Sequence, residues 1–295
     1  MPLGAALPTG ACDCHVHVFG AAAAFPMVTD RLYTPGPATF EALRTHLAHS
    51  GLSRAVVVQP SVYGTDNSCL LDTLQQSAGA ARGVAVVASD ASDELLRAMS
   101  AQGVRGVRLN VESAAERDPK ALSRSLAYWA ERVTFLNWHI QVFASFDTLA
   151  AVAPWVANLS VPLVLDHFAM APEGIDSQDT RFSAVLNLVR SGSAYVKLSA
   201  PYRLLPSGGN AHHAGAALAL ANRYVQANTS RVLWGSDWPH THRDASKTAL
   251  EVSAYRKIEP AALMRDLQAW LPGSALPQSV LVDNPAHLYG FGADR

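Results

Sequence analysis

Eight short hydrophobic segments, rich in valine and other β-branched residues, recur along the whole length of the 295-residue chain. Most are continuous rather than alternating, which is the pattern of strands buried on both faces of a parallel sheet. The predicted strands are Ala11–Val18, Ala55–Gln59, Val84–Ala88, Val104–Asn110, Ile140–Ser145, Val161–His167, Ala194–Ser199 and Val232–Asp237. Segments with helical periodicity separate them. The predicted helices are Phe40–His49, Leu70–Gly79, Asp93–Ala101, Ala121–Phe135, Thr148–Ala157, Phe182–Arg190 and Ala214–Gln226.

Eight strands alternating with helices, in a chain of this length, predict a (β/α)8 barrel, the TIM-barrel fold of the α/β class. A doubly wound open sheet is the alternative fold, but its first strand normally runs into a glycine-rich phosphate-binding turn. Here the first strand runs into His15-Val16-His17 instead. Because no linker or internal repeat interrupts the pattern, we expect one domain, residues 1–295, with extra C-terminal helices. Those helices are predicted at Ala245–Ile258, Ala261–Leu271 and Asn284–Tyr289.

The composition is that of a compact, well-buried, enzyme-like protein. Basic and acidic residues number 23 and 24, so no large net charge attracts nucleic acid or an anionic membrane. The three cysteines, Cys12, Cys14 and Cys69, cannot all pair within the chain, which indicates a reducing compartment. No secretory signal or membrane-spanning stretch is visible. We therefore expect a cytoplasmic protein, either a monomer or a homo-oligomer.

Polar residues gather at the ends of the predicted strands, where the active site of a barrel enzyme lies. They are His15, His17, Ser61, Tyr63, Arg108, Asn110, Asp166, His167, Lys197, Ser199, Arg203, Ser236 and Asp237. His15 and His17 occupy alternate positions of one strand, so both imidazoles face the same side. Such a pair can share one metal ion or hold one substrate oxygen. Arg108 lies on an apolar strand and cannot shed its charge, so it needs an anion from the protein or from a ligand.

Other polar residues in and near the strands have structural interpretations. Asp13 and Lys197 are candidates for an internal ion pair. Asp166 alternates away from His167 and is expected to brace a helix or a loop. His139 stands at the beginning of its strand, on the face of a barrel that serves stability, and is expected to be structural.

Cys12 and Cys14 alternate away from both histidines of the first strand. We expect them to pack between strands and helices rather than to bind metal. Tyr33, Tyr202 and His240 are candidates for the mouth of the pocket. The histidines expected to face solvent are His46, His49, His212 and His213.

Taken in order, these motifs resemble the amidohydrolase superfamily. The wider resemblance rests on His15-x-His17, His167 and Asp237. The closer match is to amidohydrolase family 2 and, within it, to the branch of 2-pyrone-4,6-dicarboxylate lactonase-like hydrolases. It rests on Gln59-Pro60-Ser61, Gly106-Val107-Arg108, Leu165-Asp166-His167, Lys197-Leu198-Ser199, Gly235-Ser236-Asp237-Trp238-Pro239-His240-Thr241 and Asn284-Pro285-Ala286-His287-Leu288-Tyr289-Gly290-Phe291. Together the motifs cover nearly the whole chain, and they specify the branch better than any single substrate.

The same resemblance bears on metal binding. Dinuclear members of the superfamily carry a lysine or glutamate on strand four and a histidine on strand five, where this chain has Arg108 and Phe143-Ala144-Ser145. A two-metal site therefore lacks two ligands. One zinc or manganese ion stays possible, because imidazole and carboxylate groups suit either ion. Its ligands would be His15, His17, His167 and Asp237. The pyrone lactonase needs no metal, so we expect no cofactor, with a single divalent ion as the alternative.

For function, the resemblance implies a hydrolase that opens the ring of a carboxylated lactone. Asp237 would activate the attacking water, while the catalytic histidines would polarise the lactone carbonyl. Those histidines are His15, His17 and His167. The substrate carboxylate would be bound by Arg108, Arg203, Ser61, Tyr63, Tyr33 and His240. Two further arginines hold the diacid in the pyrone lactonase, and the nearby positions here are Ala114 and Met170, which weakens the dicarboxylate assignment.

Three alternative functions stay open. A sugar-acid lactone isomerase of the galactarolactone type could use the same pocket. A single-metal decarboxylase of the superfamily would share the same histidines and aspartate. A non-catalytic binding protein could also be built on a barrel, since a fold does not guarantee a function.

Overall fold

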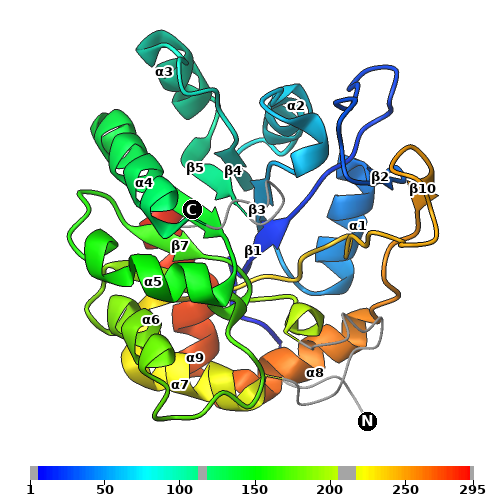
Figure 1. Ribbon diagram of the computed structural model, residues 1–295. Coiled ribbons are helices and arrows are strands. Elements are labelled where there is room, and N and C mark those ends of the chain that lie inside the picture. The colour runs from blue at the N-terminus through cyan, green and yellow to red at the C-terminus, as the bar shows by residue number, and fades with distance from the viewer. Residues whose placement is uncertain (1–5, 112–117, 205–216, 293–295) are drawn as a thin grey trace.

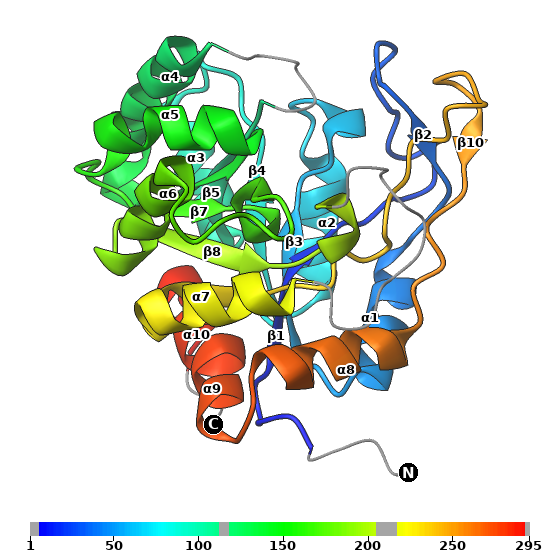
Figure 2. The same cartoon turned by 60° about the horizontal axis from the view of Figure 1, so that its bottom comes forward.

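The computed structural model describes residues 6–111, 118–204 and 217–292. Eight parallel strands form one sheet in the order β1-β3-β4-β5-β6-β7-β8-β9, and helices lie around the outside (Figure 1, Figure 2). The strands are β1 Cys12–Val16, β3 Arg54–Val58, β4 Ala81–Ala85, β5 Val104–Asn110, β6 His139–Phe143, β7 Leu163–Leu165, β8 Ala194–Leu198 and β9 Val232–Trp234. The predicted (β/α)8 barrel is confirmed, whereas the single-domain organisation over residues 1–295 stays a prediction.

Helices follow most strands and cover the outer face of the barrel. They are α1 Phe40–His49, α2 Ser68–Gln76, α3 Asp93–Ala101, α4 Pro119–Val133, α5 Phe146–Val156, α6 Thr180–Arg190, α7 Leu218–Asn228, α8 Pro260–Trp270, α9 Ala275–Gln278 and α10 Asn284–Tyr289. Several begin at a polar side chain, as α3 does at Ser92 and α5 at Ser145, whose oxygens accept a backbone N–H of the first turn. Such caps satisfy N–H groups that have no partner inside the helix and so fix where the helix begins.

One predicted helix is wrong. Residues 245–258 form turns and a short strand β10 (Val252–Ser253), which pairs in parallel with β2 (Thr34–Pro35). At the start of this segment Ser246 donates from its backbone N and its Oγ to Asp244 Oδ1, at 2.9 Å and 2.6 Å. Short polar side chains that bond to nearby groups in this way favour turns over the interior of a helix.

Several predicted boundaries also move. The strand predicted at Val84–Ala88 is Ala81–Ala85, and the one predicted at Val161–His167 shortens to Leu163–Leu165. The helix predicted at Ala214–Gln226 is observed as Leu218–Asn228. Its residues 214–216, together with Ala114, His212 and His213, lie outside the described part of the chain.

The side chains of the strands divide into two layers. Alternate residues, Val57 and Val196 among them, pack with the helices in one large cluster. The others point into the barrel and form a second cluster that includes Cys12, Cys14, Val56, Val58, Val84, Val164, Tyr195 and Leu233. The prediction for Cys12 and Cys14 is therefore wrong, because both lie inside the barrel rather than between strands and helices.

A bulge in β1 explains this error. Asp13 pairs with Ala55 and Val16 pairs with Val57, so β1 has one more residue than β3 between these two pairs. An additional residue shifts the alternation of side chains along a strand. As a result Cys14 and His15 both face the interior, which strict alternation does not allow.

The C-terminal segment closes the N-terminal end of the barrel. Tyr289 and Phe291 join the inner cluster. The guanidinium groups of Arg54 and Arg82 lie 5.1 Å and 4.7 Å from the centroid of the Phe291 ring. His139, the first residue of β6, lies at the same end with its ring centroid 5.2 Å from that of Tyr289. Tyr289 at the end of α10 and Phe291 just after it thus fill the N-terminal end of the barrel.

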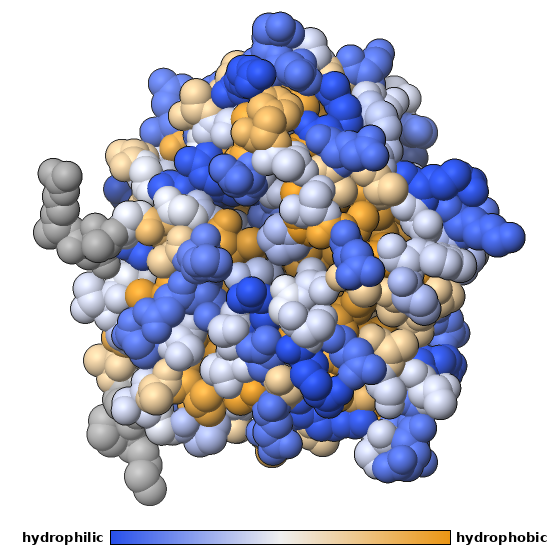
Figure 3. All heavy atoms as spheres, turned by 90° about the vertical axis from the view of Figure 1, so that its left-hand side faces the viewer, coloured by the Kyte–Doolittle hydropathy of each residue, from blue (hydrophilic) through white to orange (hydrophobic). Residues whose placement is uncertain are grey.

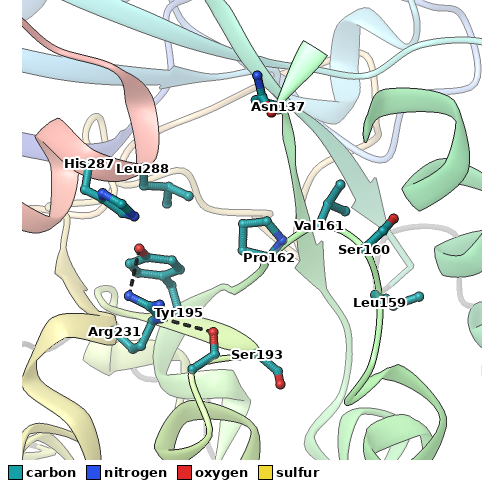
Figure 4. Close-up of a pocket in the computed structure, with 11 residues that line it drawn as sticks. Asn137, Leu159, Ser160, Val161, Pro162, Ser193, Tyr195, Arg231, His287 and Leu288 are labelled. Atoms are coloured by element: carbon teal, nitrogen blue, oxygen red, sulfur yellow. Dashed lines mark hydrogen bonds between the residues drawn. The ribbon is translucent and has the colours of Figure 1, made fainter. Parts of the chain in front are cut away.

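A pocket of about 500 Å³ opens at this end of the barrel, beside α10 (Figure 4). Arg231 and His287 line it, together with residues that precede β7 and β8. Arg231 Nη1 donates to Tyr195 Oη at 3.1 Å, so its guanidinium already has a partner in the wall. Because this end of a barrel serves stability rather than catalysis, the pocket is not the candidate active site.

No helix in residues 6–111, 118–204 and 217–292 is long and apolar enough to cross a membrane. The cysteines Cys12, Cys14 and Cys69 are free and buried. The side of the molecule that carries α4, α5 and α6 mixes hydrophilic and hydrophobic residues (Figure 3). Tyr128 on α4 and Trp155 on α5 are exposed, as single aromatic side chains often are. The expected cytoplasmic location stays a prediction.

Candidate active site

Four residues predicted from the sequence meet at the C-terminal end of the barrel. Asp237 Oδ1 lies 3.6 Å from His15 Nε2 and 3.6 Å from His17 Nε2. The same oxygen lies 4.0 Å from His167 Nε2. All four side chains are buried. Three imidazoles thus present their Nε2 atoms to one carboxylate oxygen.

The other ring nitrogens of His15 and His17 face groups that only accept hydrogen bonds. His17 Nδ1 lies 2.7 Å from the carbonyl oxygen of Val58. His15 Nδ1 lies 3.3 Å from Asp166 Oδ1. A carbonyl oxygen and an ionised carboxylate require a donor, so both histidines carry their proton on Nδ1 when neutral. Their Nε2 atoms therefore offer lone pairs to the centre of the site.

His167 differs from the other two histidines in its partner and in its backbone. Its Nδ1 lies 2.8 Å from Ser199 Oγ, a hydroxyl that can donate or accept. β7 ends at Leu165, and His167 has a φ of 50° in the left-handed region. Asp237 also has a positive φ, of 62°. Such backbone conformations cost energy in residues other than glycine and gather at functional sites.

This left-handed turn corrects the prediction for Asp166. Because regular strand geometry ends before His167, Asp166 and His167 both face the interior instead of alternating. Asp166 Oδ2 accepts hydrogen bonds from Arg108 Nη2 at 3.2 Å and from Gln141 Nε2 at 3.1 Å. Asp166 therefore holds site residues rather than a helix or a loop, and the protein itself supplies the anion that Arg108 needs.

Lys197 belongs to the same buried network, so the predicted ion pair with Asp13 is wrong. Its Nζ donates to Gln141 Oε1 at 2.7 Å and lies 3.9 Å from Asp166 Oδ1. Burial lowers the pKa of Lys197 to about 8. For Asp166, burial by itself raises the pKa, but the interaction with His15 and the charges of Arg108 and Lys197 outweigh it and hold the pKa well below its usual value. This carboxylate is therefore ionised beneath the histidines.

The second oxygen of Asp237 is held from the other side. Tyr202 Oη donates to Asp237 Oδ2 at 2.6 Å, and Arg203 donates to it from Nη2 at 2.9 Å and from Nε at 3.2 Å. Burial by itself raises the pKa of Asp237, but the charge of Arg203, together with contacts to the neighbouring histidines, outweighs it and holds the pKa well below its usual value. Arg203 thus keeps Asp237 ionised, in addition to its predicted place in substrate binding.

Two histidines of the site, His15 and His167, are neutral near pH 7. Burial lowers the pKa of His15 well below its usual value, and it lowers the pKa of His167 to about 3. Neutral imidazoles with free Nε2 lone pairs are the form in which histidine binds a metal ion. The site therefore combines neutral nitrogen donors with one ionised oxygen donor.

This donor set fits a single divalent ion. His15 Nε2 and Asp237 Oδ1 have no hydrogen-bond partner among the residues that the structure describes. Ligand atoms about 2.0–2.2 Å from one ion lie within about 4.4 Å of each other, and the separations from Asp237 Oδ1 are 3.6–4.0 Å. Two overlapping groups of three residues have ligand atoms within 4.8 Å of one another. They are His15, His17 and Asp237, and His15, Asp166 and His167. Bonds from a backbone carbonyl, a carboxylate or a hydroxyl to Nδ1 are also how proteins orient histidine ligands.

The remaining predicted substrate residues surround this centre at different distances. Ser61 lines a pocket of about 490 Å³ at the ends of β3, β4 and β5. Tyr63 is buried, and its hydroxyl accepts a hydrogen bond from Gly20 N at 3.1 Å. Burial raises the pKa of Tyr33, which also responds to the charges of Arg203, Asp237 and Arg108. His240 is buried with its ring centroid 6.4 Å from that of Tyr202.

The chain matches the amidohydrolase family over residues 12–291. This chain belongs to the amidohydrolase family. A 2-pyrone-4,6-dicarboxylate hydrolase of Comamonas testosteroni is 33% identical to it over 292 residues, which are 96% of this chain and 91% of that protein. A 4-sulfomuconolactone hydrolase of Hydrogenophaga intermedia is 29% identical to it, over 98% of this chain and 91% of that protein. A solved structure described as a probable 2-pyrone-4,6-dicarboxylic acid hydrolase of Acinetobacter baumannii, with citric acid bound, has a TM-score of 0.79 and 26% identity, and covers 96% of this chain and 100% of that one.

Sequence reasoning overlooked several residues that hold the site of this amidohydrolase. Gln141 was not considered, although alternation from His139 places it on the inner face of β6. Tyr202 was expected only at the mouth of the pocket, whereas its hydroxyl donates to Asp237 Oδ2. His46 was expected to face solvent, and it is buried with its ring stacked on Trp238 at a centroid distance of 5.7 Å. Its place on the inner side of α1 follows from the helical periodicity shared with Leu43, which is also buried. His49, by contrast, is exposed as predicted.

Proposed function

We propose that this amidohydrolase opens the ring of a carboxylated lactone by attack of water. The observation that carries the proposal is the convergence of three Nε2 atoms on Asp237 Oδ1, the free oxygen of an ionised carboxylate. The relatives described above, which are named as hydrolases of lactones, support the same chemistry. We also propose that the enzyme works in the cytoplasm, since its cysteines are free.

Asp237 is the general base in this proposal. Tyr202 and Arg203 occupy its Oδ2, which leaves Oδ1 to accept a proton from the attacking water. The same oxygen returns the proton to the leaving alkoxide when the ring opens. Positioned acid–base groups of this kind typically contribute about 10²–10⁴-fold to a rate.

The lone pairs of His15 and His17 change our view of the cofactor. A nitrogen that offers a lone pair cannot donate a hydrogen bond to a lactone carbonyl, so these two histidines cannot polarise the substrate directly. We therefore propose that one divalent ion, zinc or manganese, would be held by the predicted set His15, His17, His167 and Asp237. An oxygen of a carboxylate has two lone pairs, so Asp237 Oδ1 would keep one for the proton of the water. Such an ion supplies Lewis-acid polarisation and a lowered pKa for bound water. The expectation of a metal-free site came from the resemblance alone, and the tautomers favour the alternative.

An unused donor in the site favours an anionic substrate. Arg108 and Arg203 pair with Asp166 and Asp237, and the buried Arg108 Nε has no hydrogen-bond partner among the residues that the structure describes. A buried donor without a partner is stabilised by a ligand that accepts a hydrogen bond from it. We propose that a substrate carboxylate binds to donors of Arg108 and Arg203 not used by these aspartates. Tyr33, Ser61, Tyr63 and His240 complete the proposed substrate-binding set.

The proposal is tested by incubating the purified protein with 2-pyrone-4,6-dicarboxylate and, separately, with 4-sulfomuconolactone. Proton NMR of the product identifies ring opening, whereas an isomerase would return a lactone and a decarboxylase would release carbon dioxide. Asp237→Asn should lower kcat by about 10²–10⁴-fold because the amide cannot accept the proton. Hydrolysis by the Asn variant at the wild-type rate would contradict the assigned role.

The metal is tested in the same preparation by elemental analysis and by chelation. We expect about one zinc or manganese per chain, loss of hydrolysis after dialysis against a chelator, and recovery when the ion is returned. His17→Gln should lower the bound metal together with activity. If protein without bound metal hydrolysed the lactone at the full rate, the proposed metal site would be wrong and the site would be metal-free.

A further inference from the structure

The barrel closes at the point where its active site lies. β1 and β9 stand at the two ends of the hydrogen-bonded strand order. An isolated bridge between Val16 and Trp238 joins them, with backbone bonds from Asp237 N to His15 O at 2.9 Å and from His17 N to Trp238 O at 2.8 Å. We call residues 13–17 and 235–238 the closing seam. Two of the converging histidines lie on one side of the seam and Asp237 lies on the other.

Asp13 links the two sides of the closing seam with one carboxylate oxygen. Its Oδ1 accepts hydrogen bonds from His15 N at 3.1 Å and from Ser236 N at 2.9 Å. The residue is fully buried, and strand alternation places its side chain on the opposite face of β1 from Cys12 and Cys14. Asp13 therefore fixes the backbone of the first histidine relative to the residue that precedes Asp237.

His46 of α1 supports this carboxylate from outside the barrel. Its Nε2 lies 3.6 Å from Asp13 Oδ2. Its ring stacks on Trp238, with an interplanar angle of 24°. His46 thus contacts both sides of the closing seam, the carboxylate of β1 and the indole of the turn that follows β9.

Steric contact at Gly235 shows how closely the two sides approach. A Cβ atom on this glycine would lie 2.6 Å from His15 Cβ and 2.8 Å from His15 N. Such close packing leaves the distance between β1 and the turn at 235–238 little freedom. Asp13 Oδ1 adds side-chain hydrogen bonds to both sides of this seam, beside the backbone bonds that already join them.

We propose that Asp13, supported by His46, is a positioning residue that sets the spacing between the histidines of β1 and Asp237. It touches no reacting atom in this proposal. Its effect on catalysis rests on the function proposed above, whereas its effect on the histidine geometry does not. Catalytic groups tolerate displacements of about 0.5 Å, and a misplacement of about 1 Å can cost about 100-fold in rate.

The kinetic test compares substitutions at Asp13 with 2-pyrone-4,6-dicarboxylate as substrate. Asp13→Ala removes the oxygen that accepts hydrogen bonds from His15 N and Ser236 N. We expect kcat to fall by about 10–100-fold, with KM changed by less than about 3-fold. Asp13→Asn keeps an oxygen acceptor and should stay within about 3-fold of wild type. An Asn variant as impaired as the Ala variant would contradict the role of the shared acceptor oxygen.

Two further variants separate positioning from simple destabilisation. His46→Phe keeps an aromatic ring against Trp238 but removes the partner of Asp13, so kcat should fall by about 3–10-fold in a protein that still folds. Leu126→Ala creates a cavity in α4, away from the closing seam, and should lower thermal stability without lowering kcat. If Leu126→Ala and an Asp13 variant had the same stability and lost the same fraction of kcat, the proposal would be overturned.

An activity-independent measurement completes the test. In metal-free protein labelled with ¹⁵N-histidine, Asp13→Ala should move the ring resonances of His15 and His17, while Leu126→Ala should leave them in place. These shifts are expected even if the protein hydrolyses neither lactone, so failure of the proposed function is distinguishable from failure of this inference. Unmoved resonances in Asp13→Ala would overturn it.

Discussion

At the scale of single residues, Asp166 determines how His15 faces the substrate. Its Oδ1 lies 3.3 Å from His15 Nδ1, and its Oδ2 accepts hydrogen bonds from Arg108 on β5 and Gln141 on β6. Lys197 on β8 adds a nearby positive charge. One buried carboxylate thus joins several strands of the barrel directly under the converging Nε2 atoms. The physical consequence is that the lone pair of His15 faces the centre of the site.

Asp166→Asn should therefore impair the site without changing its shape. The amide would place a donor near His15 Nδ1 and would leave Arg108 and Lys197 without a counter-charge. We expect zinc affinity, measured by competition with a chromogenic chelator, and kcat/KM to fall by about 10–100-fold. Asp147→Asn is the matched control, because Asp147 pairs with Arg181 on the surface and its side chain is 75% exposed. If Asp166→Asn bound zinc with the affinity of wild type, this role of Asp166 would be contradicted.

At the scale of elements, the backbone at the ends of the strands determines which side chains face the site. The bulge in β1 brings His15 inward beside Cys14. A left-handed turn after β7 brings His167 inward beside Asp166. The turn after β9 approaches β1 so closely that position 235 has no room for a side chain. Departures from regular strand geometry thus occur where the site needs them.

Gly235→Ala tests the close approach at the element scale. The new methyl group would meet the Cβ atom and backbone of His15, which cannot move away like the end of a flexible side chain. We expect a loss of about 1–3 kcal/mol in the free energy of unfolding in urea, the usual range for overpacking, with a loss of activity. Gly36→Ala is the control, because its nearest neighbour would be Val252 Cγ1 at 3.8 Å. Equal stability of the two variants would contradict the steric argument.

At the scale of the whole molecule, buried neutral histidines make stability depend on pH. Burial lowers the pKa of His139 and of His167 to about 3, and that of His240 to about 4. An unfolded histidine has a pKa of about 6.5, so below that pH the unfolded chain binds protons that the folded chain does not. The free energy of unfolding therefore falls as pH falls from about 6.5 towards these folded values.

His139→Gln should remove one of the groups that make the free energy of unfolding depend on pH. A histidine with a folded pKa of about 3 costs about 2 kcal/mol of stability between pH 7 and pH 5. The free energy of unfolding in urea should be measured at pH 7 and at pH 5. The difference between the two values should be smaller in the Gln variant than in wild type by about this amount. His49→Gln is the control, because His49 is exposed and its replacement should leave the pH dependence unchanged. An unchanged pH dependence in His139→Gln would contradict the assignment of a neutral buried imidazole.

The sequence predicted the barrel, the strands that carry the site and the four residues His15, His17, His167 and Asp237. The barrel and its strands follow from hydrophobic runs and their spacing, which are local properties. The resemblance to the amidohydrolase superfamily selected the four residues from the polar side chains at the strand ends. The errors have a common origin. Cys14, Asp166 and Lys197 were placed by strict alternation or by pairing of charges, and a bulge and a left-handed turn changed which side chains face inward.

What the sequence determined by itself is therefore the fold and the identity of the converging side chains, since both follow from patterns along the chain. What only the tertiary structure decided is which atom each side chain offers. The bond from His17 to Val58 O and the contact of His15 with Asp166 place lone pairs at the centre of the site. Those partners come from other strands, at separations along the chain that no local pattern records.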